Sequence, residues 1–272
     1  MFFITTFNYK IYKLYADNFI NTYIKTNQQI PLICYVEEDF EYPKHKNITY
    51  IKLQDKMPQI IDFKKRHPDK IIEIEDEKDD STQFLQNAIK FSHKVFAQTH
   101  ASYKNEKFIF MDADNIFKKE INEHFFNSFI PNESFLTFYG RPNWVEAGII
   151  GFNSKIKDIS KTFFKIYLDF YLQDKIFEMK FKTDCQALDA TRKIMKKNPY
   201  YKETNRGDGL DGHVIFRDKE ISIYIDHRKG RRKFEKIENK RNQIDHNIKH
   251  KVNIFKKVKV NIKNFIFKKL QK

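Results

Sequence analysis

Two aspartates separated by one residue, Asp112 and Asp114, are the side chains whose types and spacing best fit metal chemistry. They follow the apolar segment 107–111, KFIFM, which has the composition of a buried strand. Carboxylates two residues apart in a loop can converge on one hard divalent cation, and such a cation binds diphosphate groups well. The pair therefore predicts a metal site for a diphosphate. A solvated turn or a helix cap is the alternative reading of a short acidic pair taken alone.

A second group of residues, far along the chain, fits the same site. His227, Gly230 and Lys233 form the pattern His-x-x-Gly-x-x-Lys, directly after the apolar segment 221–226. An imidazole nitrogen can complete the coordination that two carboxylates begin, a glycine lets backbone N–H groups approach phosphate, and a lysine neutralises phosphate charge. The two groups together describe one site, in which His227 is the third metal ligand.

Apolar segments alternate with helical patterns along the chain, as in an α/β fold. We expect strands at 2–7, 30–36, 48–53, 107–112, 134–140, 147–153 and 221–226, helices at 12–23, 83–100, 119–129, 157–173 and 184–197, and an acid-rich loop at 74–81. This alternation predicts a mainly parallel sheet, whose ligands bind beyond the carboxyl ends of the strands. Asp112 and Asp114 lie at such an end.

The positive charge of the chain is concentrated near its end. Of 51 Lys and Arg and 36 Asp and Glu, residues 228–272 hold 17 basic and 3 acidic side chains, which leaves 34 and 33 in residues 1–227. We therefore expect two parts, a catalytic domain at 1–235 and a basic, partly amphipathic extension at 236–272. A partner that bears phosphate would meet the extension rather than the whole surface.

The extension 236–272 has three interpretations that its sequence leaves open. Apolar residues recur among its basic ones at a spacing that fits one helical face, although segment 257–263 also alternates like a strand. A basic amphipathic helix binds an anionic membrane surface, at about 1 kcal/mol for each basic residue near the lipid. The same charge would neutralise nucleic acid phosphates. A helix that docks on the catalytic domain is the third interpretation.

Cysteine use and hydropathy predict a protein of the cytoplasm. Cys34 and Cys185 lie far apart without metal-ligand spacing, so we expect two free thiols in a reducing compartment. No apolar run approaches the ~18 residues of a membrane-spanning helix, and the opening segment 1–7 lacks the basic and apolar regions of a signal peptide. We expect a cytoplasmic location, peripheral at the inner face of the membrane if the extension binds lipid.

These residues resemble the motifs of GT-A glycosyltransferases. Segment 112–114 matches the Asp-x-Asp motif, and segment 227–233 is similar to the His-x-x-Gly-x-x-Lys motif of glycosyltransferase family 8. The chain also resembles a group of bacterial and viral glycosyltransferase-like proteins. Its matches to that group run in the same order and comprise a Phe-Ser-x-Lys-x-x-Ala helix at 91–97, a Glu-x-Gly strand at 146–153, an aspartate-led helix at 183–189 and an Asp-His-x-x-Gly motif at 226–230.

The resemblance implies a GT-A fold, which is Rossmann-like with a mixed, mainly parallel sheet flanked by helices. It implies a nucleotide-sugar donor, with UDP-sugars favoured, and Mn²⁺ or Mg²⁺ held by Asp112, Asp114 and His227. The residues expected around the nucleotide and its phosphates are Thr5, Thr6, Asn8, Lys94, Gly230, Arg231 and Lys233, with Glu37 or Glu38 near the ribose.

Two carboxylates are the candidates for the acceptor side. We expect Glu146 and Asp184 to act as a general base toward a hydroxyl or to bind sugar hydroxyls. Asp184 also follows Thr183 at the start of an apolar helix, so a helix-capping role is an equal alternative. For His93, a polar or satisfied core histidine is the favoured interpretation.

The chain departs from family 8 at two places, which leaves the stereochemistry of transfer open. Phe234 stands where the family has Pro-Trp, and segment 146–148 replaces Asn-Ser-Gly. The function predicted is metal-dependent sugar transfer to a glycan or glycolipid at the cytoplasmic membrane face. The alternatives are a glycosyltransferase that acts on nucleic acid, and a non-catalytic protein that binds nucleic acid or membrane on a degenerate transferase fold.

Overall fold

The computed structural model describes residues 1–68, 84–210, 212, 214–230 and 232. The chain divides into two units, Met1–Phe234 and Glu235–Lys272, and all described residues belong to the first. The predicted loop at 74–81, the basic extension 236–272, and the predicted phosphate-binding residues Arg231 and Lys233 lie outside the described residues.

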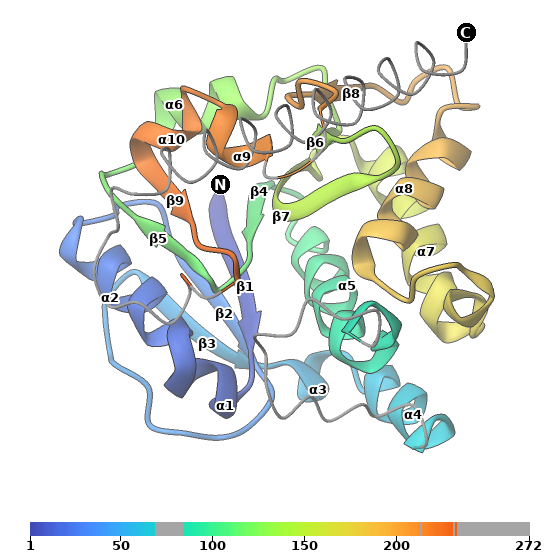
Figure 1. The fold of residues 1–272 in the computed structure, drawn as a ribbon, viewed down its shortest axis with the longest axis horizontal. Coiled ribbons are helices and arrows are strands. Elements are labelled where there is room, and N and C mark those ends of the chain that lie inside the picture. Colours follow the sequence, from blue (N-terminus) through green and yellow to red (C-terminus); the bar gives the residue numbers. More distant parts are fainter. Residues whose placement is uncertain (69–83, 211, 213, 231, 233–272) are drawn as a thin grey trace, which may run out of the picture. The chain divides into compact units, whose positions relative to one another are not determined.

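A seven-stranded mixed sheet forms the centre of the first unit (Figure 1). Its order is β3-β2-β1-β4-β7-β6-β8, and the strands are β1 (Phe2–Phe7), β2 (Leu32–Val36), β3 (Ile48–Lys52), β4 (Lys107–Met111), β6 (Leu136–Gly140), β7 (Val145–Asn153) and β8 (Glu203–Asn205). Neighbouring pairs are parallel except those that involve β7, which runs against β4 and β6. The α/β class with a mainly parallel sheet is therefore confirmed.

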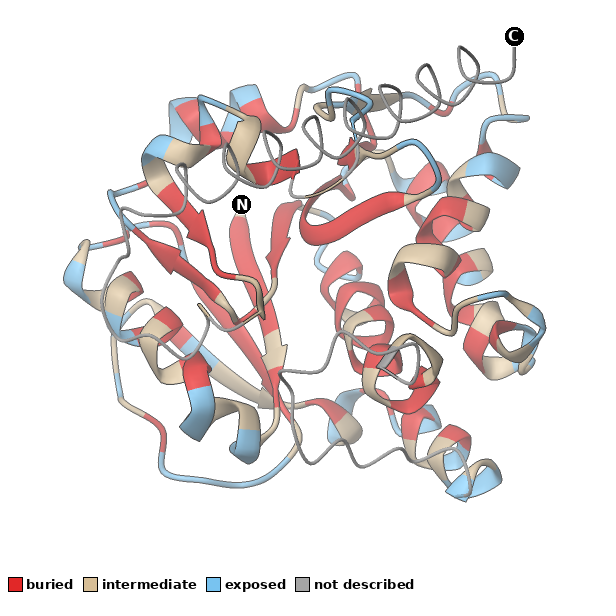
Figure 2. Ribbon diagram, viewed as in Figure 1, coloured by how far each residue is buried: buried red, intermediate tan, exposed pale blue. Residues whose placement is uncertain are grey.

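Apolar side chains on both faces of the sheet account for these strands. Successive residues of a strand point to opposite faces, and in β1 the alternate residues Phe2 and Ile4 pack in one core cluster while Phe3 and Phe7 pack in another. A strand that is covered on both sides is continuously apolar rather than alternating. Figure 2 shows the central strands as buried along most of their length.

Helices cover both faces of the sheet. One core cluster joins the sheet to α3 (Leu53–Lys56), α4 (Gln59–Arg66), α5 (Ala88–Ser102), α7 (Lys157–Leu172) and α8 (Asp184–Met195), and the other joins it to α2 (Asp17–Lys25), α6 (Glu123–Phe129), α9 (Val214–Arg217) and α10 (Ile221–Tyr224). Side-chain caps define where several helices begin, because a cap satisfies a backbone N–H that the helix leaves free. Asn87, Asn122 and Thr183 accept such bonds at the starts of α5, α6 and α8.

The helix expected at 12–23 is confirmed. It begins earlier, at α1 (Tyr9–Ile11), and continues through a π-helical turn, Tyr12–Ala16, into α2. The strand expected at 221–226 is wrong over most of its length. Ile221–Tyr224 forms one helical turn, α10, and only Ile225–His227 is extended, as β9. The apolar alternation there reflects a short helix that buries Ile221 and leaves Ile223 exposed.

A second, two-stranded sheet lies beside the main one and brings the two halves of the predicted site together. β5 (Asn115–Phe117) pairs antiparallel with β9, with Asn115 opposite His227. The sequence did not predict β5, because three residues are too few to show a period. Strand order in the main sheet reverses between β1 and β4, and ligands of open α/β sheets bind at such a switch point. The loop of Asp112 and Asp114 begins at the carboxyl end of β4.

Within the described residues, no helix has both the length and the apolar character needed to cross a membrane. Cys34 is buried in β2 and Cys185 is partly buried at the start of α8, and both are free thiols, as the sequence predicted.

Candidate functional site

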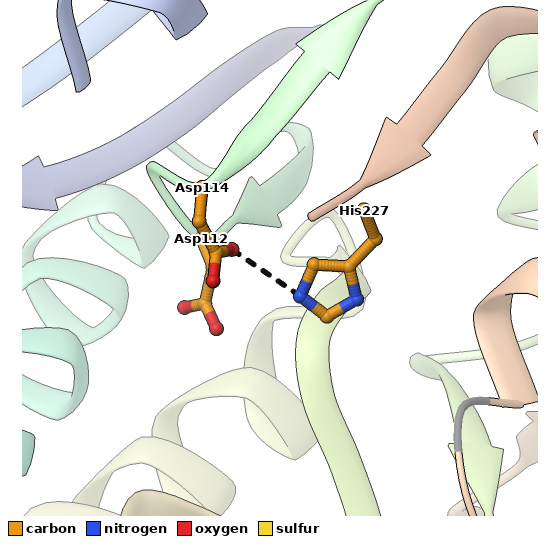
Figure 3. A group of neighbouring side chains, drawn as sticks. All are labelled: Asp112, Asp114 and His227. Atoms are coloured by element: carbon orange, nitrogen blue, oxygen red, sulfur yellow. Dashed lines mark ion pairs between the residues drawn. The ribbon is translucent and has the colours of Figure 1, made fainter. Parts of the chain in front are cut away.

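The structure brings the three predicted metal ligands together. Asp112, Asp114 and His227 each offer one ligand atom, and these atoms lie within 4.8 Å of one another. Figure 3 shows the two carboxylates and the imidazole facing one another from the loop after β4 and from the end of β9, with Asp114 Oδ1 3.3 Å from His227 Nε2. The three side chains come from segments more than a hundred residues apart.

Backbone hydrogen bonds hold these segments in place. Asp112 N–H donates to the carbonyl of Gly148 over 2.9 Å, and Arg228 N–H donates to the carbonyl of Asp114 over 3.0 Å. Asn115 is buried below the loop, and its Nδ2 donates to the carbonyl of Asp112 at 2.7 Å and to that of Gly148 at 3.3 Å. The Asp-x-Asp loop is therefore tied to β7 on one side and to the residue after β9 on the other.

Gly148 supplies the space in which the imidazole lies. A Cβ at this position would lie 2.8 Å from His227 Nε2 and closer still to Cε1. Any side chain larger than hydrogen would therefore displace the ring from the two carboxylates. This is a physical reason for glycine in the Glu-x-Gly strand, and it depends on close approach rather than on backbone conformation.

The donor atoms and their protonation fit a divalent cation. The His227 side chain is fully buried, and burial lowers its pKa despite the opposing charge of Asp114. A neutral imidazole is the form that binds metals. Its Nδ1 has no hydrogen-bond partner among the described residues. Two carboxylates and one imidazole match the oxygen-rich, mixed donor sets of Mn²⁺ and Mg²⁺ sites.

Lys94 lies between two carboxylates of this site. Its Nζ is 2.6 Å from Asp112 Oδ1 and 3.5 Å from Asp184 Oδ2. Burial lowers the pKa of Lys94, but the charges of Asp112 and Asp184 outweigh it and raise the pKa above the ordinary value. The ammonium is therefore charged. It links the Asp-x-Asp loop to the start of α8.

Asp184 is both the first residue of α8 and a fully buried carboxylate. Thr183, not Asp184, is the N-cap, because its hydroxyl accepts the N–H of Gln186 at 3.3 Å. Asp184 is thus left to face Lys94, and the capping alternative for it is wrong. Burial raises the pKa of Asp184 above its ordinary value, against the charge of Lys94. A raised pKa makes the carboxylate a stronger base toward an acceptor hydroxyl.

Glu146 holds two cations that the sequence analysis did not connect to the site. Its Oε2 is 2.6 Å from Lys229 Nζ and is also paired with Arg141, while its Oε1 accepts the N–H of Gly148 at 3.2 Å. Arg141 follows β6, and its N–H closes the hairpin by donating to Trp144 O at 2.9 Å. Lys229 lay inside the recognised 227–233 motif at a position that the motif leaves free, whereas Arg141 carried no signal.

Of the other predicted nucleotide-binding residues, Thr5, Thr6 and Asn8 lie at the carboxyl end of β1, and Gly230 lies in the loop after β9. Thr5 and Thr6 are paired with β2, and their hydroxyls have no hydrogen-bond partner among the described residues. Asn8 Oδ1 caps α1 by accepting Ile11 N–H at 2.8 Å. Gly230 has a φ of +60°, a conformation that favours glycine. Their roles toward a nucleotide remain predictions.

The partly buried Glu37 pairs with the buried His93, which precedes Lys94 in α5. His93 Nδ1 contacts Glu37 Oε1, and Lys64 Nζ lies 3.3 Å from Glu37 Oε2. The satisfied histidine that the sequence favoured is therefore what the structure contains. Glu38 Oε2 accepts the N–H of Tyr9 at 2.8 Å. The pair links the end of β2 to α5, next to Lys94.

A cavity of about 430 Å³ lies elsewhere in the molecule. It is next to the start of α7, and its lining includes Lys155, Lys157, Asn198 and Tyr200. β7 ends beside this region, where Asn153 pairs with Lys107 at the beginning of β4. The cavity is therefore at the opposite ends of the strands from Asp112, and it contains none of the predicted site residues.

Comparisons with known proteins found similar solved structures but no similar sequence. No protein-family model matches the chain, and no curated protein is similar to it in sequence. Among solved structures, the chain is similar to mouse xyloside xylosyltransferase 1, with 11% identity, a TM-score of 0.46 and coverage of 85% of this chain and 98% of that one. It is also similar to the bifunctional glycosyltransferase WbbM, with 12% identity, a TM-score of 0.42 and coverage of 75% of this chain and 38% of that one. A third similar structure is the glycosyltransferase GlyE of Streptococcus pneumoniae TIGR4, with 12% identity, a TM-score of 0.42 and coverage of 75% of this chain and 45% of that one.

These three solved structures are glycosyltransferases, and the chain spans less than half the length of two of them. At such identities and with TM-scores below 0.5, the likeness carries no evidence about activity. Evidence about activity must come from the side chains of the site.

Proposed function

We propose that the protein is a metal-dependent glycosyltransferase that moves a sugar from a nucleotide-sugar donor to an acceptor hydroxyl. The observation that carries this proposal is the convergence of Asp112, Asp114 and His227. Two sequence motifs of glycosyltransferases, far apart in the chain, meet at one group of metal-ligating atoms at the switch point of the sheet.

The charges of the site support a metal–diphosphate ligand. Three aspartates and one lysine, which are Asp112, Asp114, Asp184 and Lys94, give this group a formal charge of −2. A divalent cation would balance it, and the buried carboxylates would then be compensated as buried charges must be. The diphosphate of a nucleotide sugar would bring further oxygen ligands to the cation.

Different residues of the site have different roles in the proposed transfer. Asp112, Asp114 and His227 would hold Mn²⁺ or Mg²⁺, which supplies positive charge to the departing nucleoside diphosphate. Lys94 adds a fixed positive charge beside them. Gly230 gives phosphate access to backbone N–H groups, and Thr5, Thr6 and Asn8 bind the nucleoside at the end of β1.

Asp184 is the carboxylate that best fits the acceptor side. It is buried, its pKa is raised, and Lys94 separates it from the metal ligands. In this role it accepts the proton of the attacking hydroxyl, or it binds sugar hydroxyls without proton transfer. Glu146 is the second predicted candidate, but three donors already engage its two oxygens.

A screen of nucleotide sugars by thermal shift, with and without Mn²⁺, tests the proposal. We expect one donor, a UDP-sugar in the first instance, to raise the melting temperature only when Mn²⁺ is present. The Asp112→Asn and Asp114→Asn variants should fold, lose this shift and lose transfer. Full activity in either variant would contradict the metal assignment.

We further propose a glycan or glycolipid acceptor at the cytoplasmic face of a membrane. The support is the composition of segment 236–272, with 12 Lys and Arg against 2 acidic residues. Co-sedimentation with anionic liposomes and with duplex DNA, for the full chain and for a chain truncated after residue 235, separates the alternatives. Loss of liposome binding on truncation supports the membrane, and selective loss of duplex binding would favour a nucleic acid acceptor. Binding without donor turnover would favour a non-catalytic protein.

A further inference from the structure

Two aromatic side chains contact each other outside the core of the protein. Trp144 and Phe181 meet edge to face, with ring centroids 5.6 Å apart and ring planes at 80°. Both residues are partly exposed, and neither belongs to the two core clusters of the described residues. The pair therefore leaves apolar area at the surface, and a ligand that covers this area would gain free energy by removing it from water.

Backbone hydrogen bonds hold the two segments that carry these rings. The N–H of Arg141 donates to the carbonyl of Trp144 over 2.9 Å, which closes the hairpin between β6 and β7. The N–H of Lys182, the residue after Phe181, donates to the carbonyl of Leu85 over 2.7 Å, in the turn that precedes α5. The rings are thus positioned before a ligand arrives, so less conformational entropy is lost on binding.

The aromatic pair lies on the acceptor side of the candidate site. Phe181 is three residues before Asp184 at the start of α8, and Trp144 directly precedes β7. Arg141 of the hairpin acts electrostatically on Cys185, which adjoins Asp184. The hairpin and the segment before α8 therefore meet next to the carboxylate that is proposed to act on the acceptor hydroxyl.

The order of the strands separates this pair from the predicted nucleoside site. β4, whose carboxyl end leads into the Asp-x-Asp loop, lies between β1 and β7 in the sheet. β7 is antiparallel to β4, so its beginning lies at the same edge of the sheet as the end of β4. Thr5, Thr6 and Asn8 lie at the end of β1, whereas Trp144 lies at the beginning of β7, on the other side of that loop. The pair is therefore placed for the acceptor rather than for the nucleoside of the donor.

We propose that Trp144 and Phe181 form a platform for a pyranose ring of the acceptor, and that the platform presents a hydroxyl of this ring to Asp184. One face of a pyranose carries mainly C–H groups, while its hydroxyls point outward from the edge of the ring. Stacking on an aromatic side chain buries the C–H face and leaves the hydroxyls free for polar side chains. This inference rests on the proposed function and deepens it, because it assigns the acceptor to the class of glycans and its ring to two residues outside the recognised motifs.

The fluorescence of the wild-type protein tests the platform, because Trp144 is the only tryptophan of the chain. Quenching by acrylamide is measured for the full-length protein, loaded with Mg²⁺ and UDP, with and without the methyl glycosides of glucose, galactose, N-acetylglucosamine and xylose. We expect at least one glycoside to reduce quenching severalfold, because the sugar covers the indole. No reduction with any glycoside would overturn the inference. A reduction that UDP or anionic liposomes cause and that no glycoside increases would also overturn it, because a nucleoside or a lipid would then cover the ring.

Substitutions test whether the two rings bind the sugar. The affinity for the glycoside that shields Trp144 is measured by saturation-transfer NMR, whose signal comes from the sugar and does not need the indole. We expect Trp144→Ala and Phe181→Ala to weaken binding about tenfold or more, and Trp144→Phe, which keeps a ring, to retain most of it. Tyr103→Ala is the matched control, because Tyr103 is 61% exposed at the end of α5, before β4 begins, and should leave the affinity unchanged. Equal affinities of Trp144→Ala and the wild type would overturn the inference.

The thermal shift by a nucleotide sugar with Mn²⁺ separates this inference from the proposed function, because it reports donor binding. If the wild type shows the shift and no glycoside shields Trp144, the inference fails while the proposed function stands. If the wild type shows no shift with any donor, the proposed function fails, and shielding is then measured without metal and nucleotide. Shielding by a glycoside under these conditions supports the platform as a glycan-binding surface, and its absence overturns the inference.

Discussion

At the scale of single residues, the site depends on a close contact that only glycine permits. Gly148→Ala would insert a methyl group where the His227 ring now lies. Because the imidazole is buried, it has little room to move without leaving the two carboxylates. We expect the variant to bind Mn²⁺ at least tenfold more weakly, as is typical when the positioning of a metal ligand is disturbed. Calorimetry with MnCl₂ measures this.

Gly151→Ala is the matched control for this prediction. Gly151 is in the same strand, but a Cβ there would meet Ile130, at 2.6 Å from its Cγ1, rather than the imidazole. This variant should lower the free energy of unfolding by about 1–3 kcal/mol through overpacking and leave the Mn²⁺ affinity unchanged. Equal effects of both variants on Mn²⁺ would contradict the specific role of Gly148.

Glu37 is expected to make stability depend on pH. Burial raises its pKa, but His93 and Lys64 outweigh burial and lower it from 4.5 to about 2. A depressed pKa in the folded state contributes stability that is fully present above about pH 4.5 and is lost as the pH falls toward 2. Since its side chain is 20% exposed, we expect the contribution to fall by about 2 kcal/mol between pH 7 and pH 3. Urea unfolding of wild type and Glu37→Gln at these two pH values measures it, and parallel changes in the two proteins would exclude the effect.

At the scale of secondary structure elements, the short pair β5–β9 brings together the residues of the proposed metal centre. Asn115 of β5 bonds the carbonyls of both Asp112 and Gly148, so it ties the Asp-x-Asp loop to β7. Asn115→Ala should leave two buried carbonyls with fewer donors and lower the free energy of unfolding by about 1–3 kcal/mol. We also expect weaker Mn²⁺ binding, because the loop loses its support.

Asn153→Ala separates these two effects of the Asn115 variant. Asn153 is also a buried asparagine that bonds a carbonyl, that of Asn132 at 2.9 Å, but it lies at the opposite end of β7. The Asn153→Ala variant should have a lower free energy of unfolding and an unchanged Mn²⁺ affinity. If Asn115→Ala behaves in the same way, the β5–β9 pair does not organise the metal ligands.

Most elements were predictable from the sequence because they bury apolar runs. The strands near 2–7, 30–36, 107–112 and 147–153 and the helices near 83–100 and 157–173 are confirmed within a few residues. Short elements were not predictable. β5, β8 and α9 have three or four residues each, too few for a period, and the segment 221–226 alternates like a strand but begins as the helical turn α10.

The proposed metal ligands were predictable for a different reason, because they belong to motifs whose residue types have a chemical purpose. The contacts of Glu146 with Arg141 and Lys229 were not predictable from the sequence. The two cations come from a hairpin and from a loop, and only the register of β6 with β7, together with the position of β9, brings them to one carboxylate. The spacing of residues in the sequence does not predict such a contact.

At the scale of the whole molecule, some of the largest core side chains lie away from the proposed metal ligands. The core cluster that α5, α7 and α8 form with the sheet contains stacked and tilted aromatic rings, among them Phe135, Phe152 and Phe163. These rings lie near the half of β7 that ends at Asn153. Glu146 and Gly148 lie in the other half of the strand. The site is therefore built from polar side chains at one end of a sheet that apolar packing holds rigid.

This separation predicts that a large loss of stability need not change the proposed metal centre. Phe163→Ala removes a fully buried ring from α7, and we expect it to lower the free energy of unfolding by about 3–5 kcal/mol. At temperatures where the variant stays folded, its Mn²⁺ affinity should equal that of the wild type. Tyr200→Ala, which removes a side chain that is 80% exposed, should change stability by no more than about 0.5 kcal/mol. Urea unfolding and calorimetry on the same samples measure both quantities, and a fall in Mn²⁺ affinity for folded Phe163→Ala would show that core packing and metal binding are coupled.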